Sequence, residues 1–204
     1  MSKHYNTYLA LGDSYTIGEG VPLHESFPYH VVQQLRASGH HFNAPEIVAK
    51  TGWTTVELAE HILHTKLNDK YDFVTLLIGV NNQYRNLSLT YYESDFEFLL
   101  RKAIHFTGEQ PSKVIVLSIP DWGVTPFANG KDAGKISQAV DEFNAINEAL
   151  SKKYKVGYID ITAKSRVNAE DQSFLADDKL HYSGKLHAEW AKEVADFIEK
   201  AIHD

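Results

Sequence analysis

The sequence predicts an α/β fold, a three-layer α/β/α sandwich around a five-stranded parallel sheet. Strand-like and helix-like segments alternate along all 204 residues. Residues 73–78 and 114–119 are nearly continuous apolar runs, as expected for strands that helices cover on both faces. No internal repeat or linker-like stretch interrupts the alternation, so we expect residues 1–204 to form a single domain.

The first elements are predicted from apolar runs and helix-start signals. Residues 8–12 form a short apolar strand that runs into a glycine-rich turn. Residues 27–37 are expected to be a helix, with Ser26 near its cap and Pro28 in its first turn. Residues 46–49 predict a second, weaker strand.

Two capping-box spacings predict the next two helices on either side of the strand at 73–78. Thr54 and Glu57 are expected to open one helix, and Thr90 and Glu93 the other. The residues at helical spacing that should form the buried stripes are Val56, Ala59, Ile62 and Leu63 in the first helix, and Phe96, Leu99, Leu100 and Ala103 in the second.

The C-terminal half continues the alternation. The strand at 114–119 is closed by Pro120, and residues 156–161 predict the last strand. Between and after these strands, two amphipathic helices are predicted from apolar residues at helical spacing: Ile136, Ala139, Val140, Phe143, Ile146 and Leu150, then Leu186, Trp190, Val194, Phe197 and Ile198.

Composition excludes several classes of protein. The net charge is −7, from 27 acidic and 20 basic residues, and the basic residues form no run, which argues against nucleic acid or an anionic membrane as partner. Without cysteine the chain has no disulfide, thiolate nucleophile or cysteine zinc site. No signal peptide or membrane-length apolar run is visible, so we expect a soluble cytoplasmic protein without stable membrane insertion, although a leader already removed would leave no trace.

Residues that could take part in catalysis follow the predicted strands, at the points where the strands end. Ser14 follows the first strand, Gly52 the second and Asn81 the third, while Asp178 and His181 come after the last strand. The carboxyl ends of parallel strands share one edge of the sheet, where ligand sites collect. We therefore expect these five residues to meet at that edge.

The same residues suggest a chemistry. A serine hydroxyl needs a positioned base, so Ser14 is the candidate nucleophile, His181 its base and Asp178 the carboxylate that orients the imidazole. The backbone amides of Ser14 and Gly52 and the carboxamide of Asn81 are candidate donors to a developing oxyanion. A side chain at position 52 would obstruct the carbonyl, and Asn at position 81 donates without adding charge.

These motifs resemble those of the SGNH hydrolases, also called GDSL-type esterases and lipases. The matches are Ser14 in Gly-Asp-Ser-Tyr, Gly52 in Thr-Gly-Trp, Asn81 in Gly-Val-Asn-Asn and His181 in Asp-Lys-Leu-His, and they span almost the whole chain. The resemblance implies a flavodoxin-like three-layer fold and a metal-independent serine esterase that needs no cofactor and acts on a small-molecule acyl ester. The chain departs from the family at Asn82, where the family usually has aspartate.

Several residues near these motifs admit two interpretations. Asp177 is an alternative to Asp178 as the orienting carboxylate. Trp122 and Phe127 follow the fourth strand and either line an acyl pocket or pack their loop. Arg85 is interpreted as a solvated surface residue.

Asp13 and the histidines are interpreted as structural. Asp13 is expected to cap the turn that presents Ser14. No histidine pair matches a known metal-ligand pattern, so we expect no metal site. The pairs considered are His40 with His41, His61 with His64, and His181 with His187.

Two rival functions remain beside a serine esterase that favours short acyl chains or O-acetyl groups. The sheet edge and its glycine-rich turn could cradle a phosphate or a flavin. A catalytically silent relative could instead bind a carbohydrate or phosphate ligand. The sequence predicts neither the oligomeric state nor the natural substrate, which could be a lipid, an acetylated sugar, a lysophospholipid or a thioester.

Overall fold

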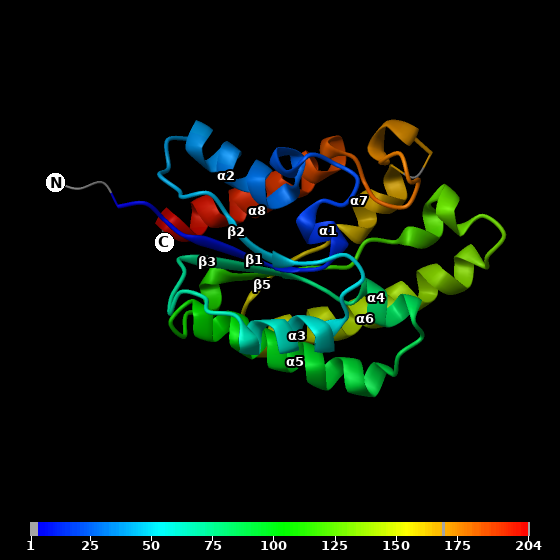
Figure 1. Ribbon diagram of the computed structural model, residues 1–204, viewed down its shortest axis with the longest axis horizontal. Coiled ribbons are helices and arrows are strands. Elements are labelled where there is room, and N and C mark those ends of the chain that lie inside the picture. Colours follow the sequence, from blue (N-terminus) through cyan, green and yellow to red (C-terminus); the bar gives the residue numbers. More distant parts are fainter. Residues whose placement is uncertain (1–3, 169, 204) are drawn as a thin grey trace.

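The computed structural model describes residues 4–168 and 170–203 and contains a five-stranded parallel sheet between two helical layers (Figure 1). The strand order is β2-β1-β3-β4-β5, and every neighbouring pair is parallel. This confirms the predicted fold class. The strands are β1 (Tyr8–Gly12), β2 (Glu46–Ala49), β3 (Phe73–Leu77), β4 (Val114–Leu117) and β5 (Gly157–Ile159).

The helices divide between the two faces of the sheet, as Figure 1 shows. One face carries α1 (Ser14–Ile17), α2 (Phe27–Ala37), α7 (Thr162–Val167) and α8 (Gly184–His203). The other carries α3 (Thr55–His64), α4 (Val80–Tyr84), α5 (Leu89–Phe106) and α6 (Ala133–Tyr154). Short 3-10 turns are η1 (Leu23–Glu25), η2 (Pro111–Lys113), η3 (Trp122–Val124), η4 (Pro126–Ala128) and η5 (Gln172–Phe174).

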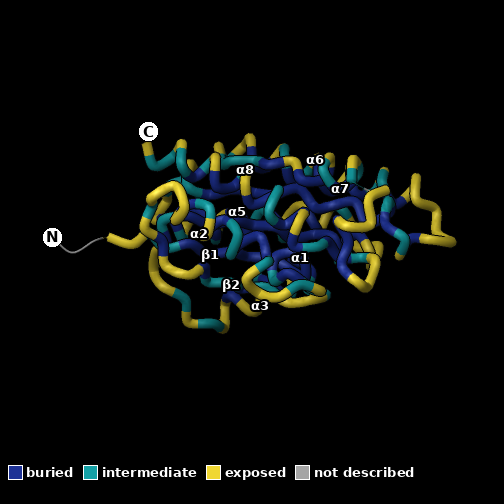
Figure 2. The backbone as a smooth tube through the Cα atoms, turned by 90° about the horizontal axis from the view of Figure 1, so that it is seen from above, coloured by how far each residue is buried: buried dark blue, intermediate teal, exposed yellow. Residues whose placement is uncertain are grey.

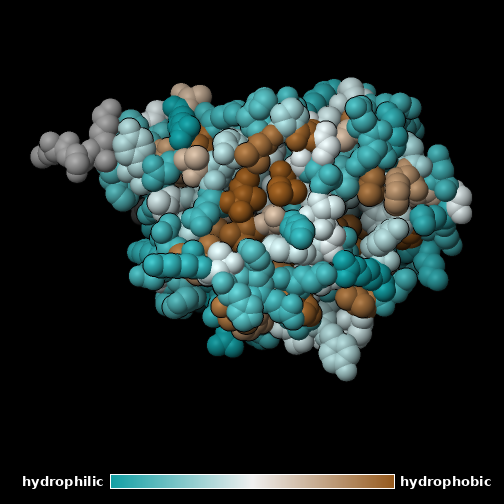
Figure 3. All heavy atoms as spheres, viewed as in Figure 1, coloured by the Kyte–Doolittle hydropathy of each residue, from teal (hydrophilic) through white to brown (hydrophobic). Residues whose placement is uncertain are grey.

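The core lies along the three middle strands. Every residue of β1, β3 and β4 is buried, whereas edge strand β2 is partly exposed. Figure 2 shows buried backbone through the centre of the molecule, and the face seen in Figure 3 is mainly hydrophilic with a group of apolar side chains near its middle. Burying one large aliphatic side chain contributes about 1.5–3 kcal/mol, so the nearly continuous apolar strands anchor the sheet.

The first predicted capping box is confirmed and the second is wrong. Thr54 N–H donates to Glu57 Oε2 at 2.7 Å, and Glu57 N–H donates back to the Thr54 hydroxyl at 3.5 Å. Helix α5 instead begins at Leu89 with Ser88 as its N-cap, so Thr90 lies inside the first turn and has no capping role.

The predicted buried stripe of α3 is also partly wrong. Val56 and Leu63 are 45% and 58% exposed, whereas Leu58 and Ile62 are buried. Helix α3 covers the sheet with the face that carries Leu58, and Val56 and Leu63 lie outside that face. Both positions fit the helical spacing, but spacing alone does not show which face of the helix packs against the sheet.

Close packing at the end of β1 sets the position of the following turn. A Cβ atom built on Gly12 would lie 2.3 Å from the carbonyl oxygen of Leu77 and 2.0 Å from the hydroxyl of Thr16. Only glycine fits between the end of β3 and the side chain of Thr16 in α1. The turn therefore holds Ser14 at the carboxyl edge of the sheet.

In residues 4–168 and 170–203, no helix is both long enough and apolar enough to cross a membrane.

Candidate active site

A cavity of about 170 Å³ lies at the carboxyl edge of the sheet. Its walls come from the segments that follow β1, β3 and β4 and from the loop before α8. Three of the five expected site residues are in this wall. The lining residues are Ser14, Tyr15, Val80, Asn81, Tyr84, Trp122, Phe127, Leu180 and His181.

Ser14 is the first residue of α1, and Asp13 is its N-cap. Asp13 Oδ1 accepts a hydrogen bond from Tyr15 N–H at 3.0 Å, which confirms that Asp13 caps this turn. Its other carboxylate oxygen is buried without a hydrogen-bond partner among the described residues. Burial raises the pKa of Asp13 to about 7 despite the backbone hydrogen bonds that favour the charged form.

His181 is held by Asp178. Asp178 Oδ2 lies 2.5 Å from His181 Nδ1, and Asp178 Oδ1 accepts the backbone N–H groups of Leu180 at 3.0 Å and His181 at 2.9 Å. Partial burial raises the pKa of Asp178, but the hydrogen bond from the His181 ring and those backbone donors outweigh it, so the net pKa is below its usual range. The structure thus places Asp178, and not Asp177, against the imidazole.

The His181 ring also packs on Tyr15, a cavity residue that the sequence reasoning missed. The ring centroids of Tyr15 and His181 are 5.4 Å apart, and Tyr15 in turn packs on Tyr182 and Trp190. The imidazole is therefore restrained by a carboxylate and by a buried aromatic ring. The only signal for Tyr15 was its position next to Ser14. Within the described part of the chain, no hydrogen bond joins the Ser14 and His181 side chains, a contact that is often long before substrate binds.

Asn81 lies in α4, directly after the tight turn at Gly79. Gly79 has φ of 133°, and a Cβ atom there would lie 2.4 Å from the Tyr92 hydroxyl oxygen. Asn81 Nδ2 donates to the carbonyl oxygen of Trp53 at 3.0 Å, which fixes the carboxamide beside the loop that contains Gly52.

Gly52 follows β2 but does not line the 170 Å³ cavity. Its φ is 84°, in the left-handed region, and the nearest atom to a Cβ built there is Arg85 Nη2 at 3.8 Å. Backbone conformation, more than crowding by the protein, therefore accounts for glycine at this position.

Arg85 is exposed to solvent, as predicted, but its guanidinium also makes defined contacts with the protein. Its Nη2 donates to the Gly52 carbonyl oxygen at 2.5 Å, and its Nη1 lies 3.4 Å from the Glu57 carboxylate. Glu57 also accepts the Thr54 backbone N–H at the start of α3. Arg85 thus links helix α4 to the Gly52 loop and to the cap of α3.

Asn82 has a structural role. It is 2% exposed, its Oδ1 accepts from Thr55 N–H at 3.0 Å, and its Nδ2 donates to the Thr55 hydroxyl at 2.8 Å. A carboxylate could accept the first bond but could not donate the second. The asparagine at this position therefore ties α4 to the first turn of α3.

Trp122 and Phe127 both lie in the cavity wall. Trp122 is 5% exposed, and its Nε1 donates to Gln83 Oε1 at 2.7 Å. Its ring packs edge-on against Tyr84 at 5.3 Å and against Phe127 at 6.1 Å between centroids. The two earlier interpretations therefore do not compete, because Trp122 packs its loop and also lines the cavity.

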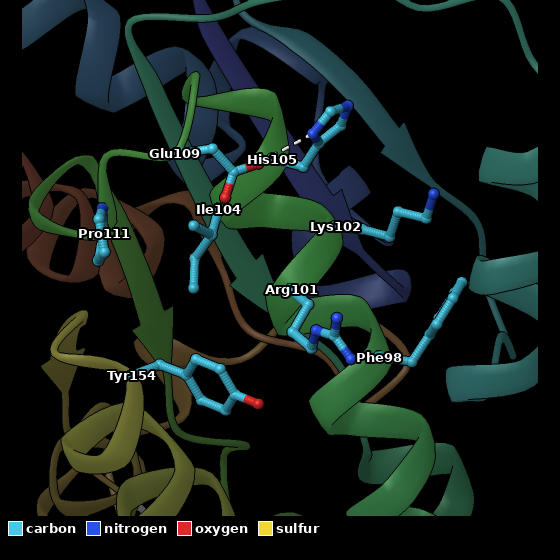
Figure 4. Close-up of a pocket in the computed structure, with 8 residues that line it drawn as sticks. All are labelled: Phe98, Arg101, Lys102, Ile104, His105, Glu109, Pro111 and Tyr154. Carbon is cyan, nitrogen blue, oxygen red and sulfur yellow. Dashed lines mark hydrogen bonds and ion pairs between the residues drawn. The ribbon is translucent and has the colours of Figure 1, made fainter.

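A larger cavity, of about 530 Å³, lies between the last turns of α5 and the end of α6 (Figure 4). Pro111, which precedes β4, is also in its wall, so this cavity lies at the amino edge of the sheet. No candidate site residue lines it. Its lining residues are Phe98, Arg101, Lys102, Ile104, His105, Glu109, Pro111 and Tyr154.

In the pair formed by His181 and His187, both imidazole rings contact other protein groups. His187 is buried, and its Nδ1 accepts from Phe27 N–H at 3.2 Å. Burial, with the nearby His30 and His181, lowers the pKa of His187 to about 3. Across residues 4–168 and 170–203, no group of three or more histidine, aspartate or glutamate side chains is placed to hold a metal ion.

The sheet order, the serine after β1 and the Asp–His pair before the last helix define a hydrolase of the α/β/α type. Residues 10–189 match the model of the GDSL-like lipase/acylhydrolase family, and the chain belongs to this family. It is accordingly an ester-bond hydrolase. No curated protein matches the sequence significantly.

Solved structures share the fold at low sequence identity. A lipase/acylhydrolase from Enterococcus faecalis is 19% identical with a TM-score of 0.76, covering 96% of each chain. A variant of the acetyl xylan esterase Axe2 from Geobacillus stearothermophilus is 18% identical with a TM-score of 0.73, covering 95% of this chain and 94% of its own. The esterase EstA from Pseudoalteromonas is 16% identical with a TM-score of 0.70, covering 98% of this chain and 100% of its own.

Proposed function

We propose that this hydrolase is a serine esterase that cleaves small carboxylic esters through an acyl-enzyme on Ser14. The observation that carries the proposal is the shared cavity. Ser14, Asn81 and His181 line one space at the sheet edge, and Asp178 holds the Nδ1 side of His181. This leaves Nε2 of His181 as the nitrogen available to the serine.

In the proposed reaction, His181 takes the Ser14 proton as the hydroxyl oxygen attacks the ester carbonyl carbon. Backbone N–H groups of Ser14 and Gly52 and the Asn81 carboxamide stabilise the oxyanion. The tetrahedral intermediate collapses as His181 protonates the departing alcohol. Water, activated by His181, then releases the acid and regenerates Ser14. Asp178 remains ionised throughout, in keeping with its lowered pKa.

The size and lining of the cavity favour a short acyl group. Sites for drug-sized ligands typically span about 300–1,000 Å³, and this cavity measures about 170 Å³. Its wall is largely apolar, with Val80, Leu180 and the aromatic rings of Trp122 and Phe127. Acetyl and similarly short acyl groups fit this combination best. The acetyl xylan esterase among the structural neighbours acts on acetyl esters, which agrees with this choice.

The first test is hydrolysis of 4-nitrophenyl acetate, butyrate and octanoate by the wild type, by Ser14→Ala and by Ser94→Ala. Ser94 is an exposed residue of helix α5, and its hydroxyl donates to the Tyr91 carbonyl oxygen, so Ser94→Ala is a control for loss of a serine away from the cavity. We expect turnover to fall from acetate to octanoate and to vanish in Ser14→Ala alone. Equal turnover by Ser14→Ala and wild type would refute the proposal.

A fluorophosphonate probe distinguishes an esterase with a narrow substrate range from a catalytically silent binding relative. An activated Ser14 becomes covalently labelled, and His181→Ala should abolish the labelling because the base is lost. One structure of the neighbouring esterase EstA is described as inhibited by monoethylphosphonate, which makes this class of probe suitable. Absence of labelling in the folded wild type would favour the silent relative.

A further inference from the structure

A second cavity adjoins the candidate active site. It measures about 420 Å³ and shares two wall residues, Tyr84 and Trp122, with the cavity that contains Ser14. Their rings pack edge-on with centroids 5.3 Å apart, so one pair of aromatic side chains separates the two spaces. A substrate that passes this pair can therefore occupy both cavities.

The two cavities differ in chemical character. Among the described residues, the wall around Ser14 contains no lysine or arginine, whereas the wall of the second cavity, which has both apolar and polar side chains, includes Lys131 and Lys135. The Lys131 ammonium lies 5.9 Å from the centroid of the Trp122 ring, at the boundary between the two spaces. The second cavity is therefore cationic on the side that faces the first.

Little in the wall neutralises these lysines. Asp132 is the carboxylate among the described lining residues, so two lysines stand against one aspartate. Asp132 Oδ1 also accepts the backbone N–H of Lys135 at 3.1 Å as the cap of α6. The chain as a whole carries a net charge of −7, so this is a local reversal of sign. Such a reversal beside a reaction site attracts anions and repels cations.

We propose that Lys131 and Lys135 bind an anionic group, a carboxylate or phosphate, at the far end of the ester substrate. The inference rests on the proposed esterase function and adds the substrate class: an ester with a short uncharged segment at the scissile bond and a negative charge beyond Tyr84 and Trp122. The anionic group can belong to the acyl part or to the alcohol part, and the experiment separates the two.

The test compares matched pairs of anionic and neutral esters. The acyl arm uses the mono-4-nitrophenyl ester of adipic acid and its carboxamide counterpart. The alcohol arm uses 4-acetoxybenzoate and 4-acetoxybenzamide. The quantity measured is kcat/KM for the anionic ester divided by kcat/KM for the neutral one, because this ratio cancels general effects of a substitution on catalysis.

The decisive variant is Lys131→Gln combined with Lys135→Gln. We expect it to lower the ratio by about tenfold in one arm or in both, as two partly exposed ion pairs are lost. Lys102→Gln combined with Lys113→Gln removes the same charge far from the site, since Lys102 lies on α5 in the wall of the cavity at the amino edge (Figure 4). This control should leave the ratio unchanged.

A reversed charge gives an independent readout. Lys131→Glu combined with Lys135→Glu should lower the ratio further and raise kcat/KM for an ester with an ammonium group in place of the carboxylate. In the wild type, the ratio should fall as salt is raised, because exposed charges are screened.

The results separate the inference from the function on which it rests. A drop in the acyl arm identifies monoesters of diacids as the substrate class, and a drop in the alcohol arm identifies esters of anionic alcohols. A ratio that stays within about twofold in both arms would overturn the inference. Ser14-dependent hydrolysis of the neutral esters would then still support the esterase, whereas its absence would count against the proposed function itself.

Discussion

The guanidinium of Arg85 donates from Nη2 to the carbonyl oxygen of Gly52 at 2.5 Å. The two residues are 33 positions apart and belong to different elements, one at the end of α4 and the other in the loop after β2. Since a peptide unit is planar, this contact fixes the plane of the Gly52–Trp53 peptide, which directly follows the Gly52 amide in the same loop. Arg85 therefore restrains the loop whose Gly52 amide is a proposed oxyanion donor.

Replacing Arg85 should impair turnover more than substrate binding. We expect Arg85→Ala to lower kcat by about tenfold with little change in KM, because the Gly52 loop loses a charge-assisted hydrogen bond that is partly exposed to solvent. Arg85→Lys should recover only part of the loss, since lysine cannot span Gly52 and Glu57 at once. Steady-state kinetics provide the measurement, with Arg101→Ala as the control. A change confined to KM would mean that Arg85 contacts substrate.

Asn81 and Asn82 form a natural matched pair, because adjacent identical residues are placed in different environments. Asn81→Ala should lower kcat by about 100-fold or more and leave the free energy of unfolding nearly unchanged, since its carboxamide is a proposed oxyanion donor. Asn82→Ala should instead lower the free energy of unfolding by about 1–3 kcal/mol, because Thr55 loses two buried hydrogen bonds. Kinetics and urea unfolding of both variants check this, and a reversed pattern would exchange the two roles.

Asp178 and Asp177 provide a second matched pair. Asp178→Asn should lower kcat on the order of a thousandfold, because an amide no longer stabilises the charged imidazole or selects its tautomer. Asp177→Asn removes the same charge one residue away and should retain near wild-type turnover. Equal losses in the two variants would point to the negative charge of the loop, and not to the contact with His181, as the cause.

The buried His187 should make stability depend on pH. Burial lowers its pKa from the usual 6.5 to about 3, so between these values the unfolded chain binds a proton that the folded chain does not. The stability from neutral His187 is fully present above about pH 6.5 and is lost as pH falls toward 3, by up to about 1.4 kcal/mol per pH unit. We expect His187→Gln to flatten this part of the profile, because Gln keeps an acceptor for Phe27 N–H but does not titrate.

Asp13 contributes to the pH dependence of stability with the opposite sign to His187. Its pKa is raised from 3.8 to about 7, so its neutral form favours the folded state at low pH and this contribution is lost as pH rises through about 7. The measurement is therefore the difference between wild type and His187→Gln in urea unfolding at several pH values from 4 to 8. A constant difference over this range would contradict the assignment to His187.

Local patterns in the sequence predicted the elements of this fold well. The apolar runs at 73–78 and 114–119 became the buried strands β3 and β4, and the Thr54–Glu57 box opened α3. In each case the signal lies within a few consecutive residues. Because parallel strands end at one edge, the same reasoning also brought Ser14, Asn81 and His181 to one cavity.

The features that could not be predicted depend on contacts between distant segments. Helical spacing assigned Val56 and Leu63 to the core, but only the docking of α3 on the sheet decides which side of that helix is covered. The contact from Arg85 to Gly52 runs from the end of α4 to the loop after β2, and the packing of Tyr15 on His181 brings together segments from near the two ends of the chain. None of these contacts can be recognised from the spacing of residues or from a short stretch of the sequence.

The pair formed by Tyr84 and Trp122 has a consequence for how such an enzyme can diversify. Trp122 is anchored by Gln83, whereas Tyr84 is 48% exposed and has more room to change. A smaller residue at position 84 would widen the passage between the two cavities without altering Ser14, Asp178 or His181. During evolution, a single substitution at position 84 could therefore change the length of substrate that the enzyme accepts, while the reaction that it catalyses stays the same.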